Sequence, residues 1–351
     1  MTMEEMLKLA VEKKASDIFL VVGQPVSFKI SGVIEKQEQQ ILTPDELSVM
    51  IDRFYVLAGR NNQNREFGDD DFSISVPKVG RFRINVFKQR GSWGAVLRVV
   101  NFTLPDIQTM GIPQTILEIG KKQKGLILVT GSAGSGKSTT LAYIINEINQ
   151  SRNCHILTLE DPIEFLHAHN KSIVSQREIG IDSANYSRAL KAALREAPDV
   201  ILIGEMRDLE TIEIAMTAAE TGHLVLSTLH TVGASNTIDR IVDVFPPGQQ
   251  QQIRFQLSMV LEAVISQQLI PTVDGKLTPA FEILKVNSAI RTLIRDGKIH
   301  QIPATIATSK EDGMIAMDDS LLKLYRDGKI DETNALYHCI NQDTMKRSLR
   351  R

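Results

Sequence analysis

The sequence predicts an α/β protein in which a parallel sheet covered by helices follows a smaller α+β domain and precedes a helical C-terminal region. Three observations support this prediction. Short, continuous apolar runs alternate with helical patterns in the middle of the chain, and such runs are typical of strands buried on both faces of a parallel sheet. The first hundred residues instead alternate polar and apolar positions, and the residues after 285 are mostly helical in pattern. The continuous runs are 126–129, 156–159, 200–203 and 224–226, and the helical patterns between them include 186–196 and 210–220.

Residues 1–100 are predicted to form the α+β domain. A helix is expected over 4–14, and Val26, Phe28 and Ile30 alternate as in a strand. Thr43-Pro44-Asp45-Glu46 is a capping box with proline at the first helical position, so a second helix should begin there. Three alternating segments follow, separated by turn residues at 77–80 and 89–91, and they predict an antiparallel meander with one buried face.

The same alternation places Arg81, Arg83 and Arg98 on the face opposite the apolar residues. Outward arginines on a sheet usually serve solubility, so the pattern by itself assigns them no further role.

Residues 101–113 contain two prolines, a glycine and no clear period, and we expect them to form an interdomain linker. Residues 114–284 are expected to form the α/β core, and residues 285–351 the helical C-terminal region.

Composition restricts the function classes. The chain has 351 residues, 42% of them hydrophobic, with a formal net charge of −2 and a pI near 6.4, which argues against constitutive nucleic-acid binding. It contains no apolar run of 18 residues, and its N-terminus is charged, so we expect a cytoplasmic protein. Cys154 and Cys339 are far apart, which excludes a zinc site built on cysteines, and both are expected to be buried.

Gly131–Thr139, GSAGSGKST, matches the pattern of a phosphate-binding loop. It follows an apolar strand pattern and precedes a helical one, which is the context that such a loop requires. Its backbone N–H groups and the helix dipole would face the phosphates, Lys137 would reach the β- and γ-phosphates, and the Ser138 hydroxyl would bind Mg²⁺. We therefore predict ATP and Mg²⁺ as ligands. The residues expected to bind nucleotide are Ser132, Ala133, Gly134, Ser135, Gly136, Lys137, Ser138 and Thr139.

Acidic and imidazole side chains follow the other predicted strands, at the edge of the sheet where ligands bind in such folds. Glu205 is the first candidate for the general base, and Glu164 is the alternative base or a partner that polarises the water. His230 would sense the γ-phosphate or hydrogen-bond to Glu205. His223 precedes its strand and is expected only to pack or cap. Asp199 stands at the beginning of its strand, too far away to hold Mg²⁺.

A phosphate loop, an acidic box, a Walker B segment and a histidine box follow one another along this chain, and in this order they resemble those of the secretion and type IV pilus motor ATPases. The segments that carry the resemblance are 131–139, the acidic box 160–165, the Walker B segment 201–208, the histidine box 221–231, and ASDIFL and RFRINVF at 15–20 and 81–87. The resemblance implies a RecA-like ATPase core with a PAS-like N-terminal domain. It also implies a homo-hexameric ring in which ATP lies between the domains and near a neighbouring subunit. Arg81, Arg83 and Arg98 would then supply a cationic clamp, with Arg195 and Arg207 as competing candidates.

Within that family, Ala289–Asp296 (AIRTLIRD) is similar to the AIRNLIRE signature of the retraction ATPases, with Thr292 and Asp296 as departures. The tetracysteine insertion usual in elongation ATPases is missing. The resemblance implies a motor for pilus retraction and twitching motility that works by interdomain closure on ATP. It further implies an inner-membrane platform protein as partner and a peripheral association with the membrane. The residues expected to couple to the partner are Ala289, Ile290, Arg291, Leu293, Ile294 and Arg295.

Other functions stay open at this point. A paralogous accessory or assembly motor would share all of these motifs. A RecA-like nucleic-acid translocase would share the core, although the acidic pI and the lack of a basic, aromatic groove argue against it. A protein that binds ATP without turnover would not need the acidic and histidine residues.

Overall fold

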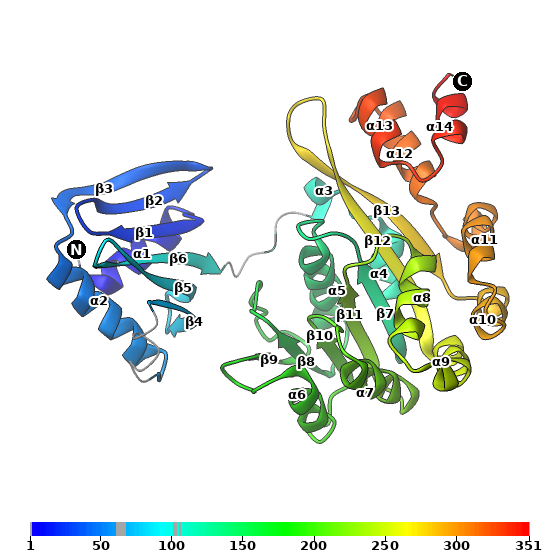
Figure 1. Ribbon diagram of the computed structural model, residues 1–351, viewed down its shortest axis with the longest axis horizontal. Coiled ribbons are helices and arrows are strands. Elements are labelled where there is room, and N and C mark those ends of the chain that lie inside the picture. Colours follow the sequence, from blue (N-terminus) through cyan, green and yellow to red (C-terminus); the bar gives the residue numbers. More distant parts are fainter. Residues whose placement is uncertain (1, 61–67, 101–103, 105–106, 351) are drawn as a thin grey trace. The chain divides into compact units, whose positions relative to one another are not determined.

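The computed structural model describes residues 2–60, 68–100, 104 and 107–350 (Figure 1). Contacts divide the chain into two units. The first comprises Met1–Thr103 together with Glu164–Leu166, and the second comprises the remaining residues of 104–351. Each unit has its own sheet and its own hydrophobic core.

The first unit contains an antiparallel sheet whose described strands lie in the order β3-β2-β1-β6-β5-β4. The predicted meander is confirmed, because Phe72, Ile84 and Leu97 occupy the same register on β4, β5 and β6. Helices α1 and α2 pack on the apolar face of this sheet, and α2 begins with the predicted capping box of Thr43 and Glu46. The elements are α1 (Met3–Glu12), β1 (Asp17–Val21), β2 (Pro25–Ile30), β3 (Val33–Ile41), α2 (Pro44–Leu57), β4 (Asp69–Val76), β5 (Gly80–Gln89) and β6 (Ser92–Val100).

The second unit contains a mixed sheet whose described strands lie in the order β13-β12-β7-β11-β10-β8-β9. The four predicted apolar runs are β7, β8, β10 and β11, and all of their pairings are parallel, as predicted. The sheet and helix elements are α3 (Ile107–Met110), α4 (Gln114–Ile119), β7 (Gly125–Thr130), α5 (Lys137–Ser151), β8 (His155–Glu160), β9 (Ile173–Glu178), α6 (Tyr186–Ala193), β10 (Val200–Ile203), α7 (Leu209–Glu220), β11 (Leu224–Leu229), α8 (Ala234–Asp243), α9 (Pro247–Val260), β12 (Leu261–Pro271) and β13 (Leu277–Lys285).

Strands β12 and β13 extend the sheet beyond the predicted set. They form an antiparallel hairpin in which Pro271 is opposite Leu277, and β12 runs parallel to β7. The hairpin therefore lies beside the strand that leads into the phosphate loop. Its turn contains Asp274-Gly275, a dipeptide that favours tight hairpin turns and that was available in the sequence as a signal.

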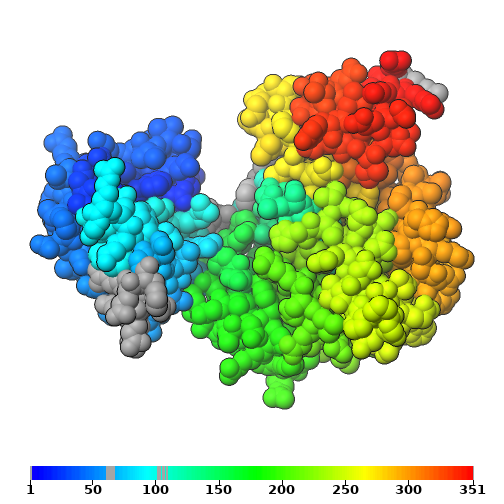
Figure 2. All heavy atoms as spheres, in the orientation of Figure 1, coloured from blue at the N-terminus to red at the C-terminus, as the bar shows by residue number. Residues whose placement is uncertain are grey.

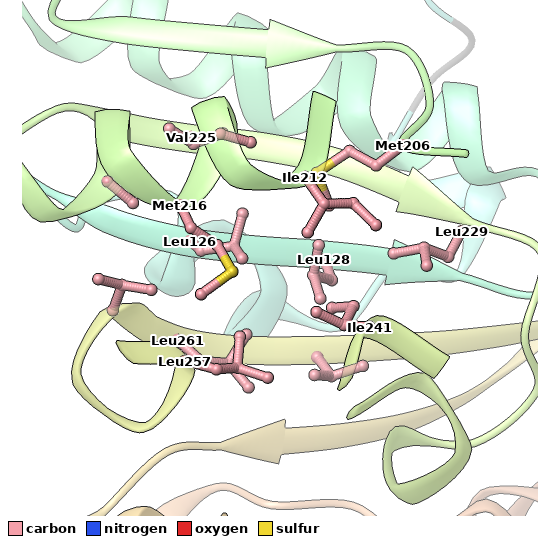
Figure 3. Close-up of a cluster of buried hydrophobic side chains, with 14 of the residues drawn as sticks. Leu126, Leu128, Met206, Ile212, Met216, Val225, Leu229, Ile241, Leu257 and Leu261 are labelled. Carbon is pink, nitrogen blue, oxygen red and sulfur yellow. The ribbon is translucent and has the colours of Figure 1, made fainter. Parts of the chain in front are cut away.

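Helices cover both faces of the second sheet. On one face, Leu126 and Leu128 of β7 contact apolar side chains from α7, α8 and α9 (Figure 3). On the other face, Ile144 and Ile148 of α5 pack over the same sheet together with Ile116 of α4. The α/β fold class predicted from the continuous apolar runs is therefore confirmed.

The C-terminal region is helical, as predicted. Its last helices lie against the β12–β13 hairpin (Figure 2), where Ile270 and Ala280 of the hairpin share a core with Leu321 and Met345. The elements are α10 (Ser288–Arg295), the 3₁₀ turns η2 (Ile299–Gln301) and η3 (Lys310–Asp312), α11 (Ile302–Thr308), α12 (Met317–Arg326), α13 (Glu332–His338) and α14 (Gln342–Leu349).

Two further expectations concern segments outside these elements. Part of the predicted linker, namely 101–103 and 105–106, lies outside the described residues, and α3 occupies Ile107–Met110 of the remainder. The expectation that both cysteines are buried is wrong, since each is partly exposed. The reason is their position, because Cys154 directly precedes β8 and Cys339 directly follows α13. Among the described residues, no helix is long and apolar enough to cross a membrane.

Candidate nucleotide-hydrolysis site

The phosphate loop connects β7 to α5, as the sequence predicts. Gly136 precedes the first helical residue with a φ of +89°, a conformation that glycine adopts without strain. No side chain caps the helix, so its first N–H groups can face an anion. Lys137 is buried, and its Nζ donates to the carbonyl oxygens of Gly131 (3.0 Å) and Ser132 (2.8 Å). The lysine thereby closes the loop on itself.

The remaining loop residues differ in exposure. Ser132, Ala133 and Gly134 form an exposed crown, whereas the Ser135 side chain is buried beneath them. Ser138 and Thr139 are half-buried in the first turn of α5. The loop therefore has an exposed backbone at 132–134, partly exposed hydroxyl groups at Ser138 and Thr139, and buried side chains at Ser135 and Lys137.

Glu205 lies two residues beyond the end of β10, and its side chain is only 17% exposed. Its Oε2 atom is 2.7 Å from Nε of Arg207 and 3.4 Å from Nε2 of His230. His230 follows β11 directly. The parallel register of β10 and β11 therefore brings together Glu205 and His230, which are 25 residues apart in the sequence. The catalytic roles assigned to them stay predictions.

Tyr186 belongs to the same neighbourhood, and sequence reasoning did not find it. A Cβ atom added to Gly204 would lie 2.7 Å from the Tyr186 hydroxyl, so this tyrosine packs directly on the residue before Glu205. Burial raises the pKa of Tyr186, and the nearby carboxylates, Glu205 foremost, raise it further. Tyr186, Asp161, Glu205 and Arg207 help to line a pocket of about 430 Å³. A tyrosine that begins a helix after a cap residue carries no sequence signal for such a position.

The acidic box surrounds the end of β8. Glu160 accepts hydrogen bonds from Thr158 (2.6 Å) and Gln176 (3.2 Å), so its side chain is anchored to the sheet. The buried Glu178 of β9 accepts from the backbone N–H of Ile163 and holds the loop beyond the strand. Glu164 is exposed, and its proposed action on the attacking water stays a prediction.

The opposite edge of the sheet holds the residues that the sequence excluded. Asp199 accepts from the backbone N–H of His155 at the start of β8, far along the strands from Glu205. Nδ1 of His223 is 3.0 Å from the carbonyl oxygen of Ala218, so this histidine caps the end of α7 as expected. Neither residue lies at the carboxyl edge of the sheet.

The three candidate arginines of the first unit lie on β5 and β6. Arg98 pairs with Asp17 at 3.1 Å and is 70% exposed, and Arg83 lies 3.9 Å from Asp71. Arg81 is only half-buried rather than fully outward, and it donates to the Ser75 hydroxyl. Arg83 and Arg98 are directly opposite each other across the strand pair, and each has an aspartate as its ionic partner. That they reach a bound phosphate stays a prediction.

Helix α10 contains the predicted partner-coupling residues, and the structure separates them. Ile290 and Ile294 are fully buried, and Leu293 is partly buried against the same core. Ala289 and Arg295 are exposed. A partner could therefore contact Ala289 and Arg295, whereas the two isoleucines only support the helix from below.

Arg291, one of the predicted partner-coupling residues, is engaged inward, whereas Arg295 one helical turn later is exposed. Its guanidinium donates to the carbonyl oxygens of Ser258 and Met259, at the end of α9, and to Glu262 of β12 at 2.8 Å. Glu262 also pairs with Lys122. Cations at a helix C-terminus satisfy its last carbonyl groups, so Arg291 braces α10 against α9.

Comparisons with known proteins agree with this architecture. Residues 1–316 match the type II/IV secretion system protein family. This chain belongs to that family. Membership confirms the predicted class, an ATP-hydrolysing enzyme of the secretion ATPases, and the predicted fold.

Two relatives and one solved structure illustrate how far the similarity extends. The type IV pilus retraction ATPase PilT of Pseudomonas aeruginosa is 42% identical over 336 residues, which are 95% of this chain and 97% of that protein. The type IV pilus ATPase PilU of the same organism is 38% identical, over 99% of this chain and 91% of that protein. A crystal structure of the pilus retraction motor PilT with bound ADP is 44% identical, covers 99% of both chains and has a TM-score of 0.88.

Proposed function

We propose that this secretion ATPase is a Mg²⁺-dependent motor that works as a hexameric ring and powers the retraction of type IV pili. The observation that carries the proposal is the Glu205–His230 contact at the carboxyl edge of the core sheet, in a chain that is similar to PilT over almost its whole length. ATP hydrolysis requires a group that orients the attacking water and cations that neutralise the phosphates. Glu205 and Lys137 are the residues suited to these tasks.

The donor set fits a nucleotide-bound Mg²⁺ ion. Among the described residues, no three histidine, cysteine or carboxylate side chains are grouped as a metal site. Mg²⁺ bound to a nucleotide keeps several water ligands and takes others from the phosphates, and the Ser138 hydroxyl in the first turn of α5 would supply a direct protein ligand. When bound, the ion would neutralise charge on the β- and γ-phosphates.

The arginines of the first unit would complete the site in the assembled ring. Arg83 and Arg98 carry exposed guanidinium groups on one sheet face, and arginines supplied from outside a phosphate loop accelerate hydrolysis strongly. Closure of the two units on ATP would then be the step that produces force. The exposed face of α10, with Ala289 and Arg295, would transmit this movement to a membrane platform protein.

Measurements on the purified protein and in the host test the proposal. The purified protein should hydrolyse ATP, hydrolysis should stop when EDTA removes Mg²⁺, and mass photometry should detect hexamers. Deletion of the gene in the host should abolish surface motility and leave the cells with excess pili. Loss of pili would identify an assembly motor instead, and lack of ATP hydrolysis would overturn the proposal altogether.

A second candidate function is that of an accessory retraction motor. The similarity to PilU, at 38% identity over nearly all of this chain, supports it. The two functions differ in whether the motor needs another retraction ATPase in the same cell. A main motor restores retraction in a strain that lacks every other retraction ATPase, whereas an accessory motor restores it only beside another one.

A further inference from the structure

The phosphate loop rests on a side chain from the hairpin that lies beside it. Gln267 of β12 is only 4% exposed, and its Oε1 accepts a hydrogen bond of 2.7 Å from the Thr140 hydroxyl. Thr140 is itself buried and lies in the first turn of α5, directly after the loop. A buried amide that bonds to the start of this helix fixes the helix relative to β12.

Gln267 also touches both ends of the loop. A Cβ atom added to Gly131 would lie 2.2 Å from the Gln267 carbonyl oxygen. One added to Gly136 would lie 2.8 Å from its Nε2 atom. These distances are far below van der Waals contact, so the loop is packed against the main chain of Gln267 at Gly131 and against its side chain at Gly136. The side chain of Gln267 therefore contacts Gly136 and Thr140, on either side of Lys137.

We propose that Gln267 is a positioning residue for the nucleotide, because it holds Gly131–Thr140 in the conformation that receives the phosphates. Glycine-rich segments lose much conformational freedom when they are ordered. A loop that is already ordered before binding does not incur this loss when the phosphates arrive. The proposal rests on the proposed function, since it concerns the same ATP site.

The neighbouring residue offers a matched control. Gln268 is adjacent on the same strand, and consecutive strand residues point to opposite faces. Its side chain contacts His338 of α13 through Nε2 and Oε1, at 3.4 and 3.1 Å. Gln268→Ala therefore removes the same chemical group from the same strand without affecting the phosphate loop.

The experiment compares Gln267→Ala, Thr140→Val, their double variant, Thr140→Ser and Gln268→Ala. The readouts are the KM and kcat for ATP, the Kd of a fluorescent ADP analogue, and the melting temperature without nucleotide. We expect Gln267→Ala and Thr140→Val each to raise Kd and KM about five- to tenfold, the size of one lost buried hydrogen bond. The double variant should be no worse than either single variant. Thr140→Ser keeps the hydroxyl, and it and Gln268→Ala should bind like the wild type.

Several outcomes would overturn the inference. A Kd within about twofold of wild type in Gln267→Ala, strictly additive effects in the double variant, or equal weakening by Gln268→Ala would each do so. If Gln267→Ala does not fold, the comparison of Thr140→Val with Thr140→Ser decides, since wild-type binding by both would refute the role of the hydrogen bond. If the wild-type protein itself neither binds nor hydrolyses ATP, the proposed function fails before this inference is reached.

Discussion

Nε2 of His230 lies 3.4 Å from Oε2 of Glu205, the same carboxylate oxygen that Arg207 approaches to 2.7 Å. Among the described residues, no hydrogen bond is made by the other oxygen, Oε1. The carboxylate is therefore held through Oε2 by two neighbouring side chains. A carboxylate that is oriented before the nucleotide binds suits the role of a general base.

Glu205→Gln should abolish turnover while preserving nucleotide binding. The amide keeps the shape of the side chain but cannot accept a proton from water, so kcat should fall at least about a hundredfold. Steady-state hydrolysis and the Kd of an ADP analogue check both parts. Turnover close to wild type would show that another group, with Glu164 as the first alternative, acts as the base.

Lys137→Ala should abolish nucleotide binding itself. The substitution removes the charge that would reach the phosphates and also the two hydrogen bonds to Gly131 and Ser132 that close the loop. Binding of an ADP analogue should become undetectable, with circular dichroism as the measure of folding. The control is Lys124→Ala, which removes an exposed lysine just before β7. Tight binding by Lys137→Ala would contradict the assignment of the loop.

Substitution of the arginines tests the predicted clamp. Arg81, Arg83 and Arg98 are replaced one at a time by alanine. If the replaced arginine stabilises the transition state, its loss should lower kcat about a thousandfold. The exposed pair Arg83–Asp71 should contribute at most about 1 kcal/mol to the free energy of unfolding, so Arg83→Ala should change the melting temperature little. Arg98→Ala also removes the ionic partner of the buried Asp17, so this variant should have a lower melting temperature than Arg83→Ala. Unchanged kcat in all three variants would exclude the clamp.

Two arginines of α10 should behave differently although they are one helical turn apart. Arg291→Ala removes hydrogen bonds to two carbonyl groups and one of the two cations that pair with Glu262 among the described residues, so it should lower the free energy of unfolding by about 1–3 kcal/mol. Arg295→Ala should leave stability and ATP hydrolysis unchanged but impair retraction in cells. Denaturant titration and a motility assay separate the two effects. Equal destabilisation by both variants would contradict the distinction.

The free energy of unfolding should depend on pH through the buried Glu282. It is buried, its Oε1 accepts from the backbone N–H of Ala234 at the start of α8, and burial raises its pKa. A carboxyl whose pKa is raised on folding binds more protons in the native state than in the unfolded state, between the unfolded and the folded pKa values. The native state is therefore destabilised as the pH rises from about 4.3, the ordinary pKa of glutamate, through the raised value.

Glu282→Gln keeps an acceptor for Ala234 and removes the charge. The variant should gain stability relative to the wild type as the pH rises through this window, and the difference should disappear below it. Melting temperatures measured from pH 4 to pH 8 provide the test. A constant difference across this range would show that the ionisation of Glu282 does not affect stability.

Local patterns predicted much of this fold. The continuous apolar runs identified the four parallel strands, and the alternating segments identified the meander. The hairpin β12–β13 was not predicted, although Asp274-Gly275 marks its turn. Its strand β12 follows α9 without an intervening loop, so no turn residues mark the boundary between the two elements. Strand β1 lies at the centre of the first sheet, but its apolar run is too short to be distinguished from a helix segment.

The sequence by itself determined the phosphate loop, the acidic and histidine residues at the strand ends, and the order of the elements. These features depend on residue type and on short spacings along the chain. Only the tertiary structure decided which distant residues meet, as with Glu205 and His230, Arg291 and the end of α9, or Gln267 and Thr140. Thr140 and Gln267 are 127 positions apart, and their contact exists because β12 pairs with β7. Strand order is set by packing of the whole core, which no local pattern encodes.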